Sequence, residues 1–193
     1  MAEERWRLFV ALELPAEVRE RLGELQRELR RQGLGHLRWV RPEGIHLTLK
    51  FLGETPVSRL AAIADALKEA VKGVPPLELG LGPAGAFGDR RGPRVLWVGL
   101  EGDLASLQEL QRRVELAMVG LGFPREERPF APHLTLARVP PEAVARSRGQ
   151  IERALAALPV PRCPLVLREV SLMRSQLQPG GAVYTRLEAF PLV

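Results

Sequence analysis

The sequence predicts an α+β fold of two related lobes, each a β-α-β-α-β unit, with antiparallel sheets that face each other around a central cleft. Stretches of alternating apolar residues, typical of strands, take turns with stretches whose apolar residues recur every three or four positions, typical of helices. This order occurs twice along the chain, and His-Leu-Thr-Leu stands at both 46–49 and 133–136, 87 residues apart. Such internal repetition indicates duplicated structural units. The 193 residues suit one domain.

The first half of the chain contains three strand patterns and two helix patterns. Strands are predicted at residues 6–12, 45–52 and 77–81. Pro15 opens and Gly33 ends the first helix, because proline suits a first helical turn and glycine suits the residue that closes one. Thr55 is expected to cap a second helix, which ends at Gly73.

The second half repeats this order. Strands are predicted at residues 95–100, 130–139, 165–172 and 183–190, with one helix capped by Asp103 and another after Pro141. The stretch Gly82–Pro93, rich in glycine, proline and arginine, is predicted to link the halves. We therefore expect a single domain over residues 1–193 with lobes at about 1–88 and 93–193; an exchange of strands between the lobes stays open.

Arginine dominates the charged residues. Lysine and arginine total 28 against 23 acidic residues, for a net charge of +5. Only three of the 28 are lysines, which leaves 25 arginines. A guanidinium matches phosphate oxygens and stacks on bases, so this composition favours a phosphate or nucleic-acid ligand. A GC-rich genome would produce the same bias, and the absence of asparagine would suit a thermophile. Composition leaves these explanations open.

Other sequence features point to a cytoplasmic protein. Arg, Glu, Gly or Pro interrupts every apolar stretch before the roughly 18 residues that a membrane helix needs. The first residues lack the apolar run of a signal peptide. Cys163 is the only cysteine, so no internal disulfide can form. We expect a monomer with no membrane association.

The two His-Leu-Thr-Leu segments are the strongest functional signal. On a strand, residues i and i+2 share a face, so His46 lies beside Thr48 and His133 beside Thr135. Two such strands facing each other would surround one small anion with two imidazoles and two hydroxyls. Opening a cyclic phosphodiester needs a base for water and an acid for the leaving oxygen, and histidine can serve as either near neutral pH. The threonines can bind phosphate oxygens. This chemistry needs no metal or other cofactor.

A single histidine on a strand is more often structural than catalytic. Two copies at matching places, in a chain with only three histidines, favour catalysis. His36 has no threonine partner and is interpreted as structural or exposed. A zinc site built from all three histidines is the competing hypothesis, but it would leave the threonines unexplained.

The segments His46–Gly53 and Arg128–Arg138 resemble the paired signatures of the 2H phosphoesterases. Within these, the chain is most similar to the RNA 2′,3′-cyclic phosphodiesterases, also called 2′-5′ RNA ligases; Arg7–Pro15 and Pro179–Tyr184 extend the similarity over almost the whole chain. The resemblance implies a bilobal fold with a basic cleft and metal-independent hydrolysis of RNA 2′,3′-cyclic phosphate ends to 2′-phosphates. It also implies that His46 protonates the leaving oxygen, that His133 activates water and that the two threonines bind phosphate.

Five further residues are weighed as neighbours of the phosphate. Arg128 and Phe130 precede the second motif and could contact phosphate and stack on a base, although a surface arginine and a core phenylalanine are equally compatible with the sequence. By strand alternation, Lys50 shares the face of His46 and could contact phosphate, whereas Arg138 falls on the face opposite His133 unless a bulge intervenes. Tyr184 borders the cleft in one interpretation.

Rival functions remain open. Gly80–Gly85 matches the dinucleotide-binding pattern, but no helix is expected to follow it, which argues against that function. The substrates expected are RNA with 2′,3′-cyclic phosphate ends or small cyclic nucleotides. The alternatives are ligation of such an end to a 5′-hydroxyl, which is the reverse reaction, and a non-catalytic module that binds RNA ends. Simple phosphate binding would be better served by arginine or lysine than by duplicated histidines.

Overall fold

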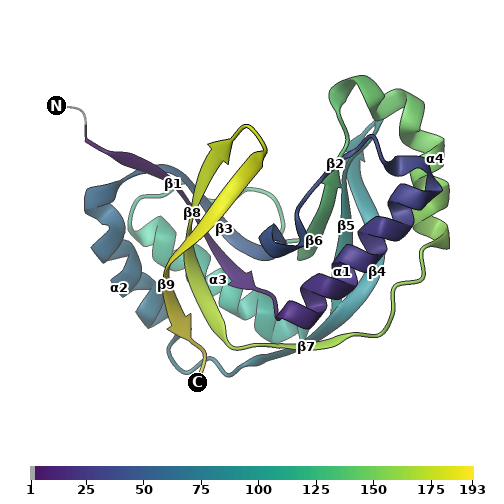
Figure 1. Ribbon diagram of the computed structural model, residues 1–193. Helices are drawn as coiled ribbons and strands as arrows, with labels where there is room; N and C mark the ends of the chain where they lie inside the picture. Colours follow the sequence, from purple (N-terminus) through teal and green to yellow (C-terminus); the bar gives the residue numbers. More distant parts are fainter. Residues whose placement is uncertain (1–2) are drawn as a thin grey trace.

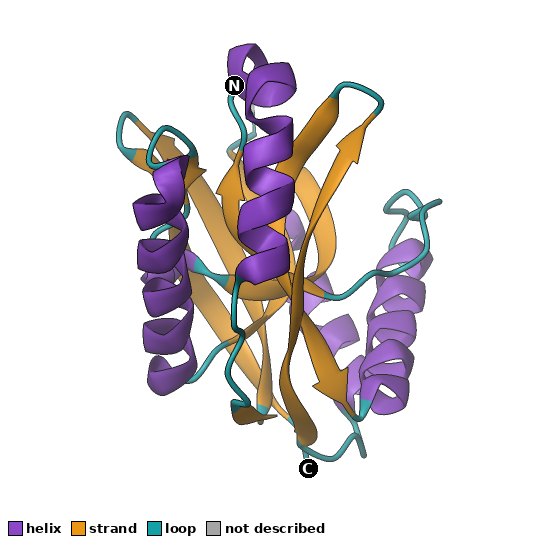
Figure 2. Cartoon of the chain, turned by 90° about the vertical axis from the view of Figure 1, so that its right-hand side faces the viewer, coloured by secondary structure: helices purple, strands orange, loops and turns teal. Residues whose placement is uncertain are grey.

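The computed structural model describes residues 3–193 and confirms an α+β fold with two antiparallel sheets (Figures 1 and 2). The strands are β1 (Arg5–Glu13), β2 (Arg38–Trp39), β3 (His46–Pro56), β4 (Leu77–Asp89), β5 (Gly92–Gly102), β6 (His133–Arg138), β7 (Pro164–Leu167), β8 (Glu169–Gln178) and β9 (Gly181–Pro191). The α-helices are α1 (Ala16–Leu29), α2 (Leu60–Val71), α3 (Leu104–Gly120) and α4 (Val144–Ala157). Short turns of 3₁₀ or π helix are η1 (Arg30–Leu34), η2 (Pro42–Gly44), η3 (Val57–Arg59) and η4 (Pro141–Ala143).

Each sheet combines strands from both halves of the chain. One sheet has the order β3-β1-β8-β9, and the other has the order β2-β6-β5-β4-β7. The late strands β8 and β9 thus complete the sheet of β1 and β3, while the early strands β2 and β4 complete the sheet of β5 and β6. Residues 88 and 93 do not separate one sheet from the other.

The two sheets diverge like the arms of a V, with β3 and β6 adjacent where the arms meet (Figure 1). Helices α2 and α3 pack on each other beside the four-stranded sheet, and α1 and α4 lie against the five-stranded sheet (Figures 1 and 2). Helix α1 follows β1 but packs on the opposite sheet, and α3 follows β5 in the same manner. No helix within residues 3–193 has the length and apolar character required to cross a membrane.

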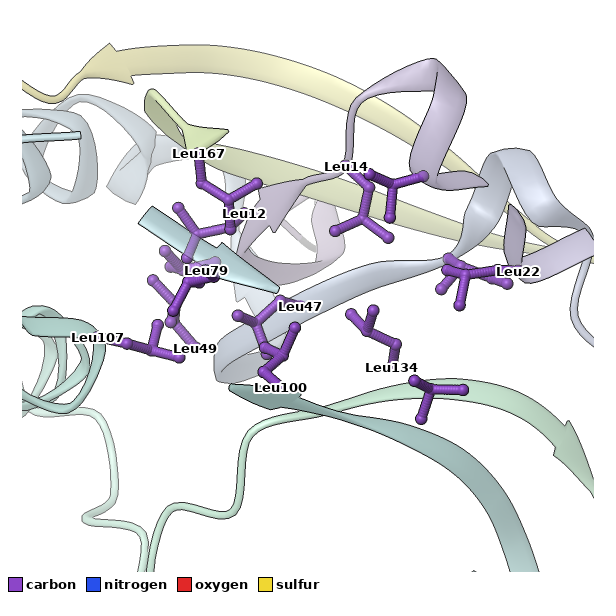
Figure 3. Packing of buried hydrophobic residues seen from close by; sticks show 14 of the residues in the cluster. Leu12, Leu14, Leu22, Leu47, Leu49, Leu79, Leu100, Leu107, Leu134 and Leu167 are labelled. Carbon is purple, nitrogen blue, oxygen red and sulfur yellow. The ribbon is translucent and has the colours of Figure 1, made fainter. Parts of the chain in front are cut away.

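One contiguous hydrophobic core joins the two arms of the V. It is rich in leucine and takes buried residues from both sheets and all four helices. Leu47 and Leu49 of β3 lie in this core together with Leu100 of β5 and Leu134 of β6 (Figure 3). Because these leucines fix the strands that carry the two histidines, the core holds the two motifs in one rigid frame.

The predicted linker Gly82–Pro93 is wrong, because this stretch belongs to the hairpin of β4 and β5. The glycines that suggested a loop have a packing role instead. A Cβ on Gly85 would lie 2.4 Å from the ring of Trp97, so only glycine lets this ring lie across β4. Pro83 falls at an irregularity of the β4–β5 register, where a missing N–H is tolerated.

Two other boundaries differ from expectation. The single strand predicted at 165–172 is two strands, β7 and β8, which belong to different sheets. Thr55 does not cap α2: it lies in β3, its hydroxyl donates to the carbonyl of Gly53 at 3.1 Å, and turn η3 precedes the helix. The Asp103 cap is confirmed, since its carboxylate accepts a hydrogen bond of 3.1 Å from the N–H of Ser106.

Candidate active site

A cavity of about 750 Å³ opens between the two sheets and brings both sequence motifs together. His46 and Thr48 of β3 line one wall, and His133 and Thr135 of β6 line the other. The remaining lining includes aromatic and charged side chains: Phe51, Phe87, Phe130 and Tyr184, and Lys50, Arg112, Glu115, Arg125, Glu126, Arg128 and Arg138. The predicted pairs therefore face a shared space.

The two histidines are held in the same way. The Nδ1 of His46 lies 2.8 Å from the carbonyl of Gly44, and the Nδ1 of His133 lies 2.7 Å from the carbonyl of Ala131. A carbonyl can only accept, so each Nδ1 carries the proton and donates it. In the neutral ring, Nε2 is then the nitrogen with a free lone pair. Both imidazoles are therefore oriented to exchange a proton through Nε2.

The surroundings of the two imidazoles differ. The ring of His46 stacks on Phe9 at a centroid distance of 4.7 Å and meets the edge of Tyr184 at 5.0 Å. Burial lowers the pKa of His46 below its ordinary value, and the hydrogen bond to Gly44 and the charge of Glu13 only partly oppose this shift. His133 meets one aromatic ring, that of Phe87, edge-on at 4.9 Å.

We expect an NMR titration of the ligand-free protein to give His46 a pKa below the ordinary 6.5 of histidine. In the unfolded chain this group binds a proton more readily. The stability that comes from keeping it neutral is thus present above about pH 6.5 and is lost as the pH falls below that value. Phe9→Leu should raise the pKa toward 6.5 by admitting water. A pKa above 6.5 in the unmodified protein would contradict this description of the site.

The prediction that Lys50 shares the face of His46 is wrong. Thr48 pairs with Ala11 and Lys50 pairs with Val10, so Leu49 is an extra residue that bulges out of β3. Cross-strand partners share a face, and Val10 is fully buried in the core. Lys50, the partner of Val10, therefore lies on the buried face of β3. Its Nζ lies 2.9 Å from a carboxylate oxygen of Glu115 and donates to the carbonyl of Pro124. Lys50 borders the cavity, but its charge is paired.

A bulge in β6, the exception left open in the sequence analysis, moves Arg138 to the face of His133. Thr135 pairs with Trp97 and Ala137 with Leu96, which leaves Leu136 as the extra residue of β6. Alternation resumes one step later, so Arg138 is exposed and lines the cavity together with His133 and Thr135. The guanidinium can therefore reach an anion in the cleft.

The remaining candidates divide into two groups. Arg128 and Phe130, on the segment before β6, both line the cavity, and Phe130 also packs on the core. His36 does not line the cavity: its Nε2 lies 2.8 Å from the hydroxyl of Ser147 on α4. A zinc site made from all three histidines does not fit this placement.

Sequence reasoning did not assign Phe9 and Phe87, which contact the two histidines. Phe9 alternates with Leu8 and Val10 in β1 and so lies on the opposite face of the strand. An aromatic residue on that face was the signal in the sequence that could have identified it. Phe87 lay in the stretch interpreted as a linker, so its position on a strand could not be used. Tyr184, weighed only as a neighbour of the cleft, contacts His46 directly.

Comparison with known proteins shows the family of the chain. The model of the family described as LigT like Phosphoesterase matches the chain twice, over residues 12–97 and 98–184. The chain belongs to this family. The tandem match reflects the same internal repetition as the two His-x-Thr motifs. A relative from Methanothermobacter thermautotrophicus, named RNA 2′,3′-cyclic phosphodiesterase, is 34% identical over 187 residues, which are 96% of this chain and 98% of the relative.

Solved structures of similar proteins have the same fold. The protein TT0787 of Thermus thermophilus superposes with a TM-score of 0.77 at 31% identity, covering 96% of this chain and 97% of that protein. LigT of E. coli in complex with 3′-AMP also gives 0.77, at 27% identity over 98% of this chain and 99% of LigT. The bilobal α+β arrangement is thus that of the family.

Proposed function

We propose that this protein hydrolyses the 2′,3′-cyclic phosphate at the end of an RNA to a 2′-phosphate, with His46 and His133 as its acid–base pair and without a metal. The observation that carries the proposal is the symmetric arrangement of these histidines in one cleft, each with Nδ1 bound to a main-chain carbonyl. Relatives over nearly the full length are named for this activity. LigT, a structural neighbour, binds 3′-AMP.

The proposed reaction follows from the properties of the two imidazoles. In neutral form, one takes a proton from water at Nε2 while the water oxygen bonds to phosphorus. The bond from phosphorus to the 3′ oxygen breaks, and the other imidazole, in its protonated form, gives its proton to that oxygen. By the resemblance of the two motifs to those of the 2H phosphoesterases, we assign the acid to His46 and the base to His133. A bound phosphodiester anion favours the protonated form of a nearby imidazole and so opposes the effect of burial on His46.

Other groups of the cleft suit a phosphate-containing substrate. The hydroxyls of Thr48 and Thr135 can donate to non-bridging oxygens, and charge that develops there is stabilised by fixed donors. Arg138 and Arg128 supply guanidinium groups to the same cavity. Phe130 offers an apolar surface to a base. These roles explain why β3 and β6 each have polar side chains on one face, although the other face of each strand packs in the core.

We also propose that the chain acts as a single domain, as a monomer and in the cytoplasm. Each sheet uses strands from both halves, and one chain supplies both walls of the cleft. A second copy is therefore not needed to complete the site.

The test is incubation with a short RNA that ends in a 2′,3′-cyclic phosphate, in the presence of EDTA, followed by identification of the product. We expect a 2′-phosphate, because the 3′ oxygen leaves. An otherwise identical RNA with a 3′-phosphate end is the control and should stay unchanged. Binding without turnover would support a module that only holds RNA ends. A joined product on addition of a 5′-hydroxyl RNA, without hydrolysis, would support the ligase.

A further inference from the structure

A second repeated motif accompanies the His-x-Thr pair. Glu-Leu-Gln-Arg occurs at 24–27 on α1 and at 109–112 on α3, 85 residues apart, close to the spacing of the two histidines. Nothing in the proposed chemistry uses these helices directly. Their glutamines, Gln26 and Gln111, are nevertheless at matching positions of the two halves, one on each side of the molecule.

Both glutamines reach the strand that carries a histidine of the cleft. The Nε2 of Gln26 donates to the carbonyl of Leu136 at 3.0 Å and to the carbonyl of Val40 at 2.7 Å. The Nε2 of Gln111 donates to the carbonyl of Leu49 at 3.4 Å. Gln26 is only 1% exposed, so few other partners compete for its amide. The contact from Gln26 is the shorter and more enclosed of the two.

Besides Val40, the residues that accept these hydrogen bonds are bulged residues of the two motif strands. Leu136 is the extra residue of β6, and Leu49 is the extra residue of β3. A bulge interrupts the ladder of main-chain hydrogen bonds, so its carbonyl benefits from a donor outside the sheet. The carbonyl of Leu136 also accepts from the N–H of Val40 at 2.9 Å, which ties β2 to the same point.

Each bulge decides which side chain follows the threonine into the cleft. With the bulge, the residue five positions after the histidine, Arg138 in β6 and Phe51 in β3, lies on the face of the histidine. Without it, strict alternation would direct that residue to the opposite face. Phe51 is 67% exposed and Arg138 is exposed, and both line the cavity.

We propose that Gln26 and Gln111 are positioning residues, whose amides hold the two main-chain bulges and thereby direct Arg138 and Phe51 into the cleft. Gln111 is among the residues that line the cavity and Gln26 is not, but the role needs only the hydrogen bonds to the bulged residues. The duplicated helix motif then serves the same site as the duplicated strand motif. Measuring this role by turnover rests on the proposed function, so the binding of inorganic phosphate provides an independent measurement.

The test is a double-mutant cycle between Gln26 and Arg138. Gln26→Met keeps the length of the side chain and removes its donor, and we expect kcat/KM to fall about tenfold, with weaker binding of inorganic phosphate. In the background of Arg138→Met, the same change should have little further effect, because the residue that the bulge directs is already gone. Gln111→Met should lower kcat/KM by the same factor in the Arg138→Met background as in the wild-type protein, because Gln111 contacts β3 and Arg138 lies on β6.

Leu22→Val is the matched control, because Leu22 lies on α1, is fully buried and has no hydrogen-bond donor in its side chain. It should lower the melting temperature but leave kcat/KM and phosphate affinity unchanged. Unchanged kinetics in Gln26→Met, or effects of Gln26→Met and Arg138→Met that simply multiply, would overturn the proposal. If Gln26→Met does not fold, the cycle of Gln111→Met with Phe51→Ala replaces it. Phosphate affinity still decides the question if the wild-type protein does not cleave RNA.

Discussion

Replacing either histidine of the cleft with alanine should lower turnover of an RNA 2′,3′-cyclic phosphate end by about 10²–10⁴-fold, the usual contribution of a general acid or base. In the proposed mechanism, both His46 and His133 take part in one proton-coupled step. The double variant should therefore be little worse than either single variant. Steady-state rates of the three variants and of the wild-type protein provide the measurement.

The matched control is His36→Ala, whose imidazole meets Ser147 outside the cleft and should leave turnover unchanged. Circular dichroism should show intact secondary structure in all of these variants, since the two cleft histidines are not part of the core cluster. Near-wild-type turnover in either His46→Ala or His133→Ala would remove that residue from the proposed mechanism.

Lys50→Met should be the most destabilising of the substitutions considered, by about 3–5 kcal/mol, the usual cost of removing one partner of a buried ion pair. The side chains of Lys50 and Glu115 are only 5% and 12% exposed, so the remaining carboxylate would be left without its counter-charge. Urea unfolding of the two proteins measures the change in the free energy of unfolding.

Lys50→Met combined with Glu115→Met should recover most of this loss, because the pair is then replaced by apolar groups of similar size. The exposed pair of Lys72 and Glu69 offers a control, and Lys72→Met should change the free energy of unfolding by less than about 1 kcal/mol. A cost for Lys50→Met as small as that of Lys72→Met would show that the charge of Glu115 is well solvated in the folded protein.

The sequence was sufficient for the fold class and for the two His-x-Thr motifs. Both depend on signals that can be recognised in the sequence alone, namely the periodicity of apolar residues and the exact repetition of a motif. The topology did not follow from these signals. Strands β4 and β8 join the sheet of the opposite half, and nothing local in their residues distinguishes this pairing from pairing within a half.

The faces of Lys50 and Arg138 could not be predicted for a related reason. One extra residue, Leu49 or Leu136, reverses the alternation of the residues that directly follow it. A leucine at either position does not by itself indicate a bulge. The contacts that accompany the bulges come from Gln26 and Gln111, on helices distant in the sequence. Likewise, the glycines of β4 resembled a linker because the ring of Trp97, which requires Gly85, lies on another strand.

The pH dependence of kcat/KM on an RNA 2′,3′-cyclic phosphate end, measured with and without EDTA, tests the paired-histidine mechanism most directly. One imidazole must be neutral and the other protonated in the same molecule, so the profile should rise and then fall with pH. Its two limbs belong to the coupled pair rather than to one residue. We predict a bell-shaped profile that EDTA leaves unchanged; activity that EDTA abolishes and a divalent metal restores would contradict the mechanism.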